Sequence, residues 1–598
     1  MRLAAGILCA VVVAAVAAAG DARAGDRPAA AEAAPAVRAK GGFGGLGLPK
    51  PPEDPRAAAE GHLRRAREAF DASVKMAKDG QYLAMDGFYV ACEEAWNAVW
   101  SCPGDREILQ EAAWVYADAL AGFLETACAR GRLRPEGVWV GPRSKPVLVP
   151  FAPKALPLDP ALIGSIESAR LPDDRRLTRR ITRAGFGLPV VVRVKEPAGG
   201  RDAASTSGRQ SLAATAVLRF RMPGDENFLE TFAGPAYRDH AAAVLDLANP
   251  VEVAAVKIGP ARPHLAADLT APLLDILAAK PRTSAVEGFI QPFGRGDTRP
   301  RLELLEPHRP GRIPVVFIHG LASDEGTWFD MINELRGWPE FHRRFEPWVY
   351  QYPTGAAFLM SAAALRRELA QAAAELDPDG VDPALRQMVL VGHSMGGLHA
   401  KVQASSAGTA IWDAIAWEPF DRLRLPPAAR GRMAEAYFFE AAPHVTRIVC
   451  IATPHRGSIL ASLGVGRAAS LAVKSPPEAQ AVHDAAVTLN PGAFKPDFAK
   501  RVPTTIDMLE PSSGLLHAIE GLRPACWVAV HSVVGTGHLS VTGGRDDCVV
   551  SEASAHTAGA RSEIAVPATH TKVHHHPDTI REVQRILAEH VRECGAEK

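Results

Sequence analysis

The chain has 598 residues, enough for roughly three or four domains of ordinary size. Hydrophobic residues make up 47% and charged residues 22%, which is ordinary for a globular protein. Lys and Arg together number 67, and so do Asp and Glu. With no excess of charge, the composition excludes bulk electrostatic attraction to nucleic acid, and no nucleic-acid partner is expected.

Residues 1–24 are predicted to be a signal peptide. A positive start at Arg2 precedes the apolar stretch "LAAGILCAVVVAAVAAAG", and Ala22-Arg23-Ala24 offers an Ala-x-Ala cleavage site. The alternative is an uncleaved membrane anchor, which the shortness and high alanine content of the stretch disfavour. We therefore expect an exported protein that is periplasmic, secreted or held at the cell surface.

A linker and a helical unit follow. Residues 25–54 are rich in Ala, Pro and Gly and are predicted to be flexible. In residues 55–137, apolar side chains recur at helical spacing in three successive stretches, which predicts three helices. Their aromatic side chains are expected to pack a core rather than to form a binding surface.

Residues 138–300 are predicted to form a β-rich accessory region. The short β-branched runs "LPVVVRVKEP", "ATAVLRFRM" and "PVEVAAVKIG" are separated by Gly, Pro and Asp, and "AADLTAPLLDILAAKP" is the one clear helix among them. The region contains no constellation of catalytic residues, so its role stays open.

Residues 301–598 alternate between buried strands and helices. The strands are expected at "IPVVFIHG", "QMVLVGHS", "VTRIVCIATP", "CWVAVHSVVG" and "SEIAVP". Continuous apolar runs of this kind are typical of parallel strands that are covered on both faces. The predicted fold class is α/β, with a mostly parallel sheet and helices on both faces, preceded by the helical unit and the β-rich region.

The stretch "VLVGHSMGGLHAKVQA" places Ser394 between a predicted strand and a predicted helix. A Gly-x-Ser-x-Gly turn in that context strains the serine backbone and exposes its hydroxyl at the edge of the sheet. Gly392 and Gly396 are small enough for neighbouring backbone to approach, and His393 completes the turn. Ser394 is the predicted nucleophile.

A serine nucleophile also needs donors for the oxyanion that forms when it attacks a carbonyl. The predicted strand "PVVFIHG" ends at His319-Gly320, and its following loop is expected to turn back over the serine. The backbone N–H groups of Leu321 and Met395 are the predicted oxyanion hole.

The base and its acid should follow in the chain order serine, acid, histidine. "GGRDDCVVSEASA" offers Asp546 or Asp547 as the acid, and the loop after "SEIAVP" offers His570 as the base. His574, His575 and His576 lie closer to the last helix. A metal on these three is disfavoured because consecutive histidines cannot easily share one ion, and neither metal nor cofactor is expected.

Several motifs together resemble bacterial serine esterases and lipases of the α/β-hydrolase superfamily, over about residues 300–592. They are "IPVVFIHGLASDEGTW", "VLVGHSMGGLHAKV", "IATPHRGS" and "DDCVVSEASAHTAGARSEIAVPATH". In such proteins the acid precedes a glycine and two valines. The resemblance therefore implies Asp547 as the acid, with Cys548 in the glycine's place and Asp546 in reserve. It also implies His570 as the base and His455 as a structural or pocket-lining residue.

The substrate class follows less directly. Apolar stretches after the nucleophile helix and between "IATPHRGS" and "CWVAV" are placed where a cap would lie. They favour an acyl or lipid-like ester substrate and are compatible with membrane association; the alternative is that they are simply packed core. The sequence leaves a partner protein unknown. The alternatives are an amidase or peptidase with the same residues, and an inactive binding or scaffold protein. Export permits disulfides, and Cys526 and Cys548 flank one predicted strand as a candidate pair.

Overall fold

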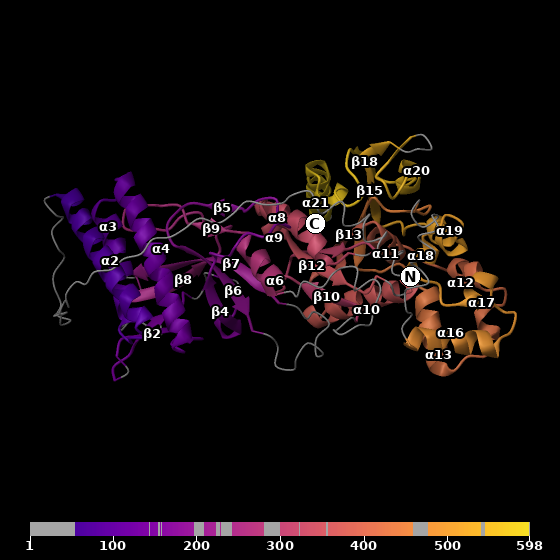
Figure 1. Ribbon diagram of the computed structural model, residues 1–598, viewed down its shortest axis with the longest axis horizontal. Coiled ribbons are helices and arrows are strands. Elements are labelled where there is room, and N and C mark those ends of the chain that lie inside the picture. Colours follow the sequence, from indigo (N-terminus) through magenta and orange to yellow (C-terminus); the bar gives the residue numbers. More distant parts are fainter. Residues whose placement is uncertain are drawn as a thin grey trace, which may run out of the picture.

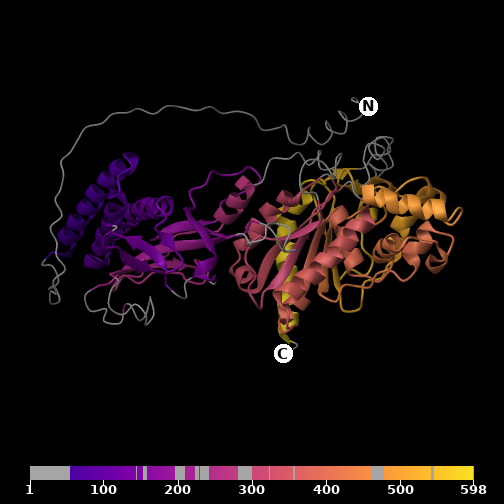
Figure 2. The same cartoon turned by 90° about the horizontal axis from the view of Figure 1, so that it is seen from below.

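The computed structural model describes residues 54–142, 144–152, 156, 158–195, 209–222, 228, 242–279, 299–321, 323–354, 357–458, 477–539 and 544–596. The predicted signal peptide and all of the predicted linker except Asp54 lie outside these residues. Along the longest axis of the molecule, the N-terminal helices lie at one end and helices of a cap at the other, with the largest sheet between them (Figure 1, Figure 2).

The helical unit consists of α2 (Pro55–Lys78), α3 (Ala84–Ser101) and α4 (Arg106–Ala129). The carboxylates of Asp54 and Asp105 cap α2 and α4 by accepting backbone N–H groups of the first turn. Trp96 and Tyr116 pack against Phe186 of the following region. The three helices and that region therefore share one hydrophobic core.

The β-rich region has a four-stranded antiparallel sheet in the order β4-β6-β7-β8. Its strands are β4 (Ile163–Ser168), β6 (Leu188–Val194), β7 (Ser211–Phe220) and β8 (Ala243–Ala248). The short strands are β1 (Leu133–Arg134), β2 (Gly137–Val140), β3 (Val147–Pro150), β5 (Thr182–Arg183) and β9 (Ala267–Asp268).

Two expectations for this region were wrong in detail. "PVEVAAVKIG" forms only isolated bridges, at Ala255 and Ile258. A turn at Gly259 reverses the chain directly after Ile258, which pairs with Ala261. The preceding run at 243–248 is the fourth strand instead. The predicted helix begins later than expected, as α6 (Ala271–Ala279), since Asp268 ends a strand and its carboxylate accepts the N–H of Ala271.

The largest sheet has seven strands in the order β10-β12-β11-β13-β14-β15-β18. Only β10 runs antiparallel to its neighbour; the other pairs are parallel. The strands are β10 (Arg301–Leu304), β11 (Ile313–Ile318), β12 (Phe345–Gln351), β13 (Met388–His393), β14 (Val445–Ile451), β15 (Ala529–Gly535) and β18 (Ser562–Val566). The expected mixed α/β architecture with a mostly parallel sheet is confirmed.

Alternate residues of these strands enter two separate cores. Val316, Ile318 and Leu390 pack toward α10 (Phe358–Leu376) and α11 (Met395–Gln403). Val315 and Phe317 pack on the other face toward α8 (Phe329–Arg336) and α21 (Pro577–Ala596). Helices on both faces explain why the strands are apolar throughout.

A helical cap follows α11 and has its own small core. Its helices are α12 (Ala410–Ile415), α13 (Pro427–Tyr437), α16 (Pro477–Leu489), α17 (Pro496–Lys500), α18 (Thr505–Met508) and α19 (Gly514–Gly521). Trp412, Phe494 and Phe498 are central to this core, whereas Trp417 is largely exposed. The predicted apolar stretch at 458–474 lies outside the described residues apart from Ser458.

The N-terminal half is fastened to α8 by a polar contact. Thr178 donates both its backbone N–H and its hydroxyl to the buried carboxylate of Asp330, at 2.7 Å each. Arg179 pairs with Glu334, also on α8, at 2.6 Å. The apolar side chains of α6 lie in the same core as α8 and α21.

Two further expectations concern cysteines and membranes. The seven cysteines of the described residues are all free, so Cys526 and Cys548 do not form the candidate disulfide. Of the helices that the structure describes, none combines the length and the apolar character needed to span a bilayer.

Candidate active site

Ser394 lies at a sharp junction between β13 and α11. Its backbone has φ 55° and ψ −123°, one of three positive φ values among the described non-glycine residues. A side chain in this region costs on the order of 1–2 kcal/mol, so the surrounding structure must hold it there. The backbone N–H of Ser394 donates to Ile451 of β14 at 2.8 Å, which helps to fix the turn.

The glycines around Ser394 are required by close contacts. A Cβ atom on Gly392 would lie 2.3 Å from the backbone of Gly396, and one on Gly396 would lie 2.1 Å from the carbonyl oxygen of Ile318. A Cβ on Gly320 would lie 2.9 Å from that of Ser394. The end of β11 and the serine turn are therefore packed backbone against backbone.

Asp547 and His570 meet in a buried pair. The Nδ1 atom of His570 lies 2.7 Å from Oδ2 of Asp547, and the backbone N–H of His570 donates to the carbonyl of Asp547. The other carboxylate oxygen, Oδ1, accepts the N–H groups of Val549 at 2.9 Å and Val550 at 2.7 Å. Asp547 is fully buried and its orientation is fixed at both oxygens.

His393 joins this pair to the serine turn. Its Nε2 lies 2.9 Å from the backbone carbonyl of His570, and the two rings lie 4.8 Å apart. Because a carbonyl only accepts, Nε2 carries the proton, and Nδ1 of His393 is left without a partner. The residue beside Ser394 thus holds the backbone of His570.

The expected position of His574 was wrong. It was placed at the rim of the last helix with His575 and His576, but it is buried against the His393 ring at 4.3 Å. Its Nε2 bonds the hydroxyl of Thr327 at 2.7 Å. The short 3-10 helix η6 (Val573–His575) turns its side chain inward, and periodicity reasoning gives no signal for so short an element.

Of the two predicted oxyanion donors, Met395 directly follows Ser394, and Leu321 follows Gly320, which packs against Ser394. Met395 is the first residue of α11, and Leu321 follows Gly320 at the end of β11. Among the described residues, neither backbone N–H has an acceptor. A developing oxyanion requires unpaired donors of this kind, and the role of these two N–H groups stays a prediction.

Asp546 points away from His570. Its Oδ1 lies 2.7 Å from Nδ1 of His538 across the antiparallel pair β16 (His538–Leu539) and β17 (Arg545–Asp546). Ligand atoms of His538, Asp546 and Cys548 lie within 4.8 Å of one another, the one such group in the described part of the chain. The expectation of no metal stays a prediction.

Cys548 has φ 77°, so it keeps a backbone conformation that favours glycine. We expect Cys548→Gly to raise the free energy of unfolding by about 0.5–1 kcal/mol, because strain relief of about 1–2 kcal/mol exceeds glycine's entropic cost. Urea unfolding measures the difference. Cys526→Gly, at a cysteine with negative φ, is the control and should not stabilise; equal gains in both variants would contradict the explanation.

Burial holds several histidines neutral. Loss of solvation lowers the pKa of His342 to about 4, and those of His399 and His455 to about 3. Burial also lowers the pKa of His393 and of His574 well below the usual range. The rings of His393, His399 and His574 pack against aromatic side chains, which agrees with an uncharged state at neutral pH.

Stability should therefore fall on acidification. Below about pH 6.5 these histidines are protonated in the unfolded state but stay neutral in the folded state. Acidification therefore stabilises the unfolded state, and the stability present above pH 6.5 is lost as pH falls toward 4. Each such group contributes a slope of about 1.4 kcal/mol per pH unit. Urea unfolding between pH 7.5 and 5 checks this, and His399→Gln should flatten the slope whereas the exposed His517→Gln should not. A pH-independent midpoint would contradict it.

Comparisons with known proteins find similarity among solved structures alone: no protein family and no curated protein matches. The mature lipase BlEst2 of Bacillus licheniformis is 16% identical, with 49% of this chain and 98% of that chain covered and a TM-score of 0.27. Butyrate-bound esterase Est2 of Thermogutta terrifontis is 15% identical, with 50% and 92% covered and a TM-score of 0.26. The lin2722 product of Listeria innocua is 15% identical, with 46% and 92% covered and a TM-score of 0.24.

Proposed function

We propose that the protein is a serine hydrolase of the α/β-hydrolase type that cleaves carboxylic esters with acyl or lipid-like chains. The observation that carries the proposal is the strained Ser394 beside a buried Asp547–His570 pair, linked to the serine turn by the bond from His393. A folded protein maintains this costly arrangement when the serine must be exposed to a reacting group.

In the proposed reaction, the Ser394 hydroxyl attacks the ester carbonyl carbon while Nε2 of His570 takes the hydroxyl proton. Asp547 keeps the other proton on Nδ1 and stabilises the imidazolium that forms. The N–H groups of Met395 and Leu321 hold the oxyanion. His570 then returns the proton to the leaving alcohol, and water releases the acid from the acyl-enzyme.

A small apolar cavity of about 50 Å³ between the cap and α10 supports a short acyl chain in the substrate. Phe358 and Met360 of α10 line it with Met433, Val482 and Leu515 of the cap. Phe358 in turn packs on His399, whose ring lies 4.6 Å from Tyr352, and Tyr352 stacks on His319 at 4.4 Å. A row of packed rings therefore lies between the cavity and the loop after β11 that contains Gly320.

A substrate panel tests the proposal. The purified protein should hydrolyse p-nitrophenyl esters and prefer acyl chains longer than acetate, because the cavity buries additional methylenes. Matched p-nitroanilides distinguish the amidase alternative, which predicts comparable rates on amides. A protein that cleaves neither class and is not labelled by a fluorophosphonate would instead be the inactive binding protein.

A further inference from the structure

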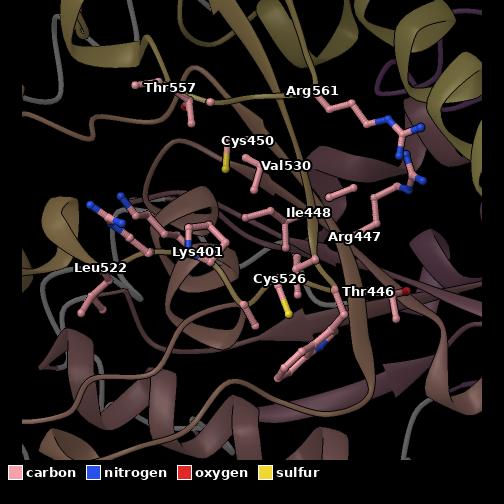
Figure 3. Close-up of a pocket in the computed structure, with 18 of the residues that line it drawn as sticks. Lys401, Thr446, Arg447, Ile448, Cys450, Leu522, Cys526, Val530, Thr557 and Arg561 are labelled. Carbon is pink, nitrogen blue, oxygen red and sulfur yellow. The ribbon is translucent and has the colours of Figure 1, made fainter.

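A second cavity of about 890 Å³ lies away from the proposed catalytic residues. It covers the outer part of β14 and β15, between α11 and the segment before β15 on one side and the C-terminal end of α21 on the other. Figure 3 shows Lys401 on one wall and Arg447 and Arg561 on the opposite wall, with Ile448 and Val530 between them. Ser394, Asp547 and His570 do not line it.

The wall with Arg447 and Arg561 is electrically balanced. Arg447, almost fully buried, lies 3.4 Å from a carboxylate oxygen of Glu589, and Arg561 lies 2.8 Å from the same oxygen. Both arginines also pair with Glu593. The positive charges of the two arginines are therefore balanced by two carboxylates, so this wall has no net positive charge that would attract an anion.

The wall with Lys401 is not balanced. Lys401 is 8% exposed, and its ammonium donates to the backbone carbonyl of Glu520 at 2.7 Å. The carboxylate of Glu520 forms an ion pair with Arg456 at 2.6 Å. Within the described residues, no carboxylate lies at ion-pair distance from Lys401. Burial lowers the pKa of Lys401, which reflects the cost of an ammonium without a counter-charge.

His455 and Arg523 add donors on the same wall. His455 is 3% exposed and its Nδ1 has no partner, while its Nε2 lies 3.0 Å from the hydroxyl of Thr557. When that hydroxyl donates to Nε2, the proton of His455 is on Nδ1, a buried atom with no acceptor among the described residues. Arg523 is exposed and has no ion pair among the described residues.

Part of the cavity lining is apolar. Ile448 and Val530 of the sheet, with Leu522 of the segment before β15, line it beside the Lys401 wall. A ligand with a short apolar chain would match this part of the lining better than a hydrated inorganic ion would. The size of the cavity lies within the range of small-molecule sites, about 300–1,000 Å³.

We propose that this cavity binds a small amphiphilic oxyanion, a carboxylate or phosphate on a short apolar chain, with Lys401 and His455 as donors to the anionic oxygens. Arg523 attracts the anion from solvent, and the chain lies on Ile448, Val530 and Leu522. The site is separate from Ser394 and its occupation does not require the proposed hydrolysis.

Titration calorimetry with octanoate, octyl phosphate and the neutral analogue octanamide tests this proposal. One anion should bind each chain, and Lys401→Met should weaken it about 10- to 100-fold, since a charged hydrogen bond contributes about 1.5–3 kcal/mol. Lys500→Met, at an exposed lysine of the cap, is the matched control and should bind as the wild type does. The tighter of the two anions identifies the head group.

Binding that Lys401→Met leaves unchanged would place the anion elsewhere, for example at Ser394, and would overturn the proposal. So would equal binding of octanamide, or no binding of either anion. If Lys401→Met does not fold, the Arg523→Gln variant is tested in its place. It should weaken binding of the anion about threefold, because it removes the positive charge that attracts the anion from solvent. An unchanged affinity in that exposed variant would then overturn the proposal.

Discussion

Replacing Ser394 by alanine should lower ester hydrolysis by about 10⁴-fold or more while the protein stays folded. Alanine keeps the Cβ atom, so the contact with Gly320 and the strain of φ 55° are the same in both proteins. Only the oxygen that attacks the ester is lost. The measurement is the turnover of a p-nitrophenyl ester, together with the melting temperature.

The control for this change is Ser406→Ala, at an exposed serine shortly after α11, the helix that follows Ser394. Its hydroxyl contacts Glu440 at the surface, so its loss should leave turnover unchanged. Labelling by a fluorophosphonate should likewise disappear from Ser394→Ala and persist in Ser406→Ala. Retained turnover in a pure Ser394→Ala sample would rule out Ser394 as the nucleophile.

Asp547→Asn should lower turnover by about 10⁴-fold, whereas Asp546→Asn should have an effect of less than about tenfold. The reason is that one oxygen of the Asp547 carboxylate accepts backbone N–H groups while the other contacts His570. If the asparagine oxygen accepts the N–H groups of Val549 and Val550, its amide NH₂ faces Nδ1 of His570. That nitrogen must then accept, which puts the ring proton on Nε2 and removes the base that Ser394 needs.

Asp546→Asn is the matched control because the two aspartates are adjacent and differ in their partners. The carboxylate of Asp546 contacts His538 and the N–H of Cys548, and an asparagine oxygen can still accept that N–H. Steady-state kinetics at saturating ester compares the variants. A larger loss in Asp546→Asn than in Asp547→Asn would show that the acid is the other residue.

Five of the seven strands of the largest sheet could be predicted because their signals are long and redundant, whereas β10 and β12 were not predicted. Five continuous apolar runs match five parallel strands, and each is followed by a turn or helix signal. Strand order also brings the serine turn and the His570 loop to the same sheet edge, since parallel strands end together. The β-rich region lacks this redundancy, and there a run interrupted by Gly259 was mistaken for a strand.

Side-chain direction was beyond the sequence signals. "HHHP" before a helix gives no indication that His574 turns inward to His393 while its neighbour His575 reaches Asp330 at 3.5 Å. Nor does the nucleophile helix reveal that Lys401 lacks a carboxylate partner, because partners come from segments more than 100 residues away. Contacts of this kind depend on how elements pack, which local periodicity does not encode.

The fastening of the N-terminal half to α8 bears on how this protein could have been assembled in evolution. Thr178 holds Asp330, Asp330 faces His575, and His574 packs on the ring that holds His570. A cut at residue 300 would also remove Leu273 and Ile276 from a core that they share with α21. A lineage that lost the N-terminal half would therefore have to rebuild that apolar surface on the C-terminal half.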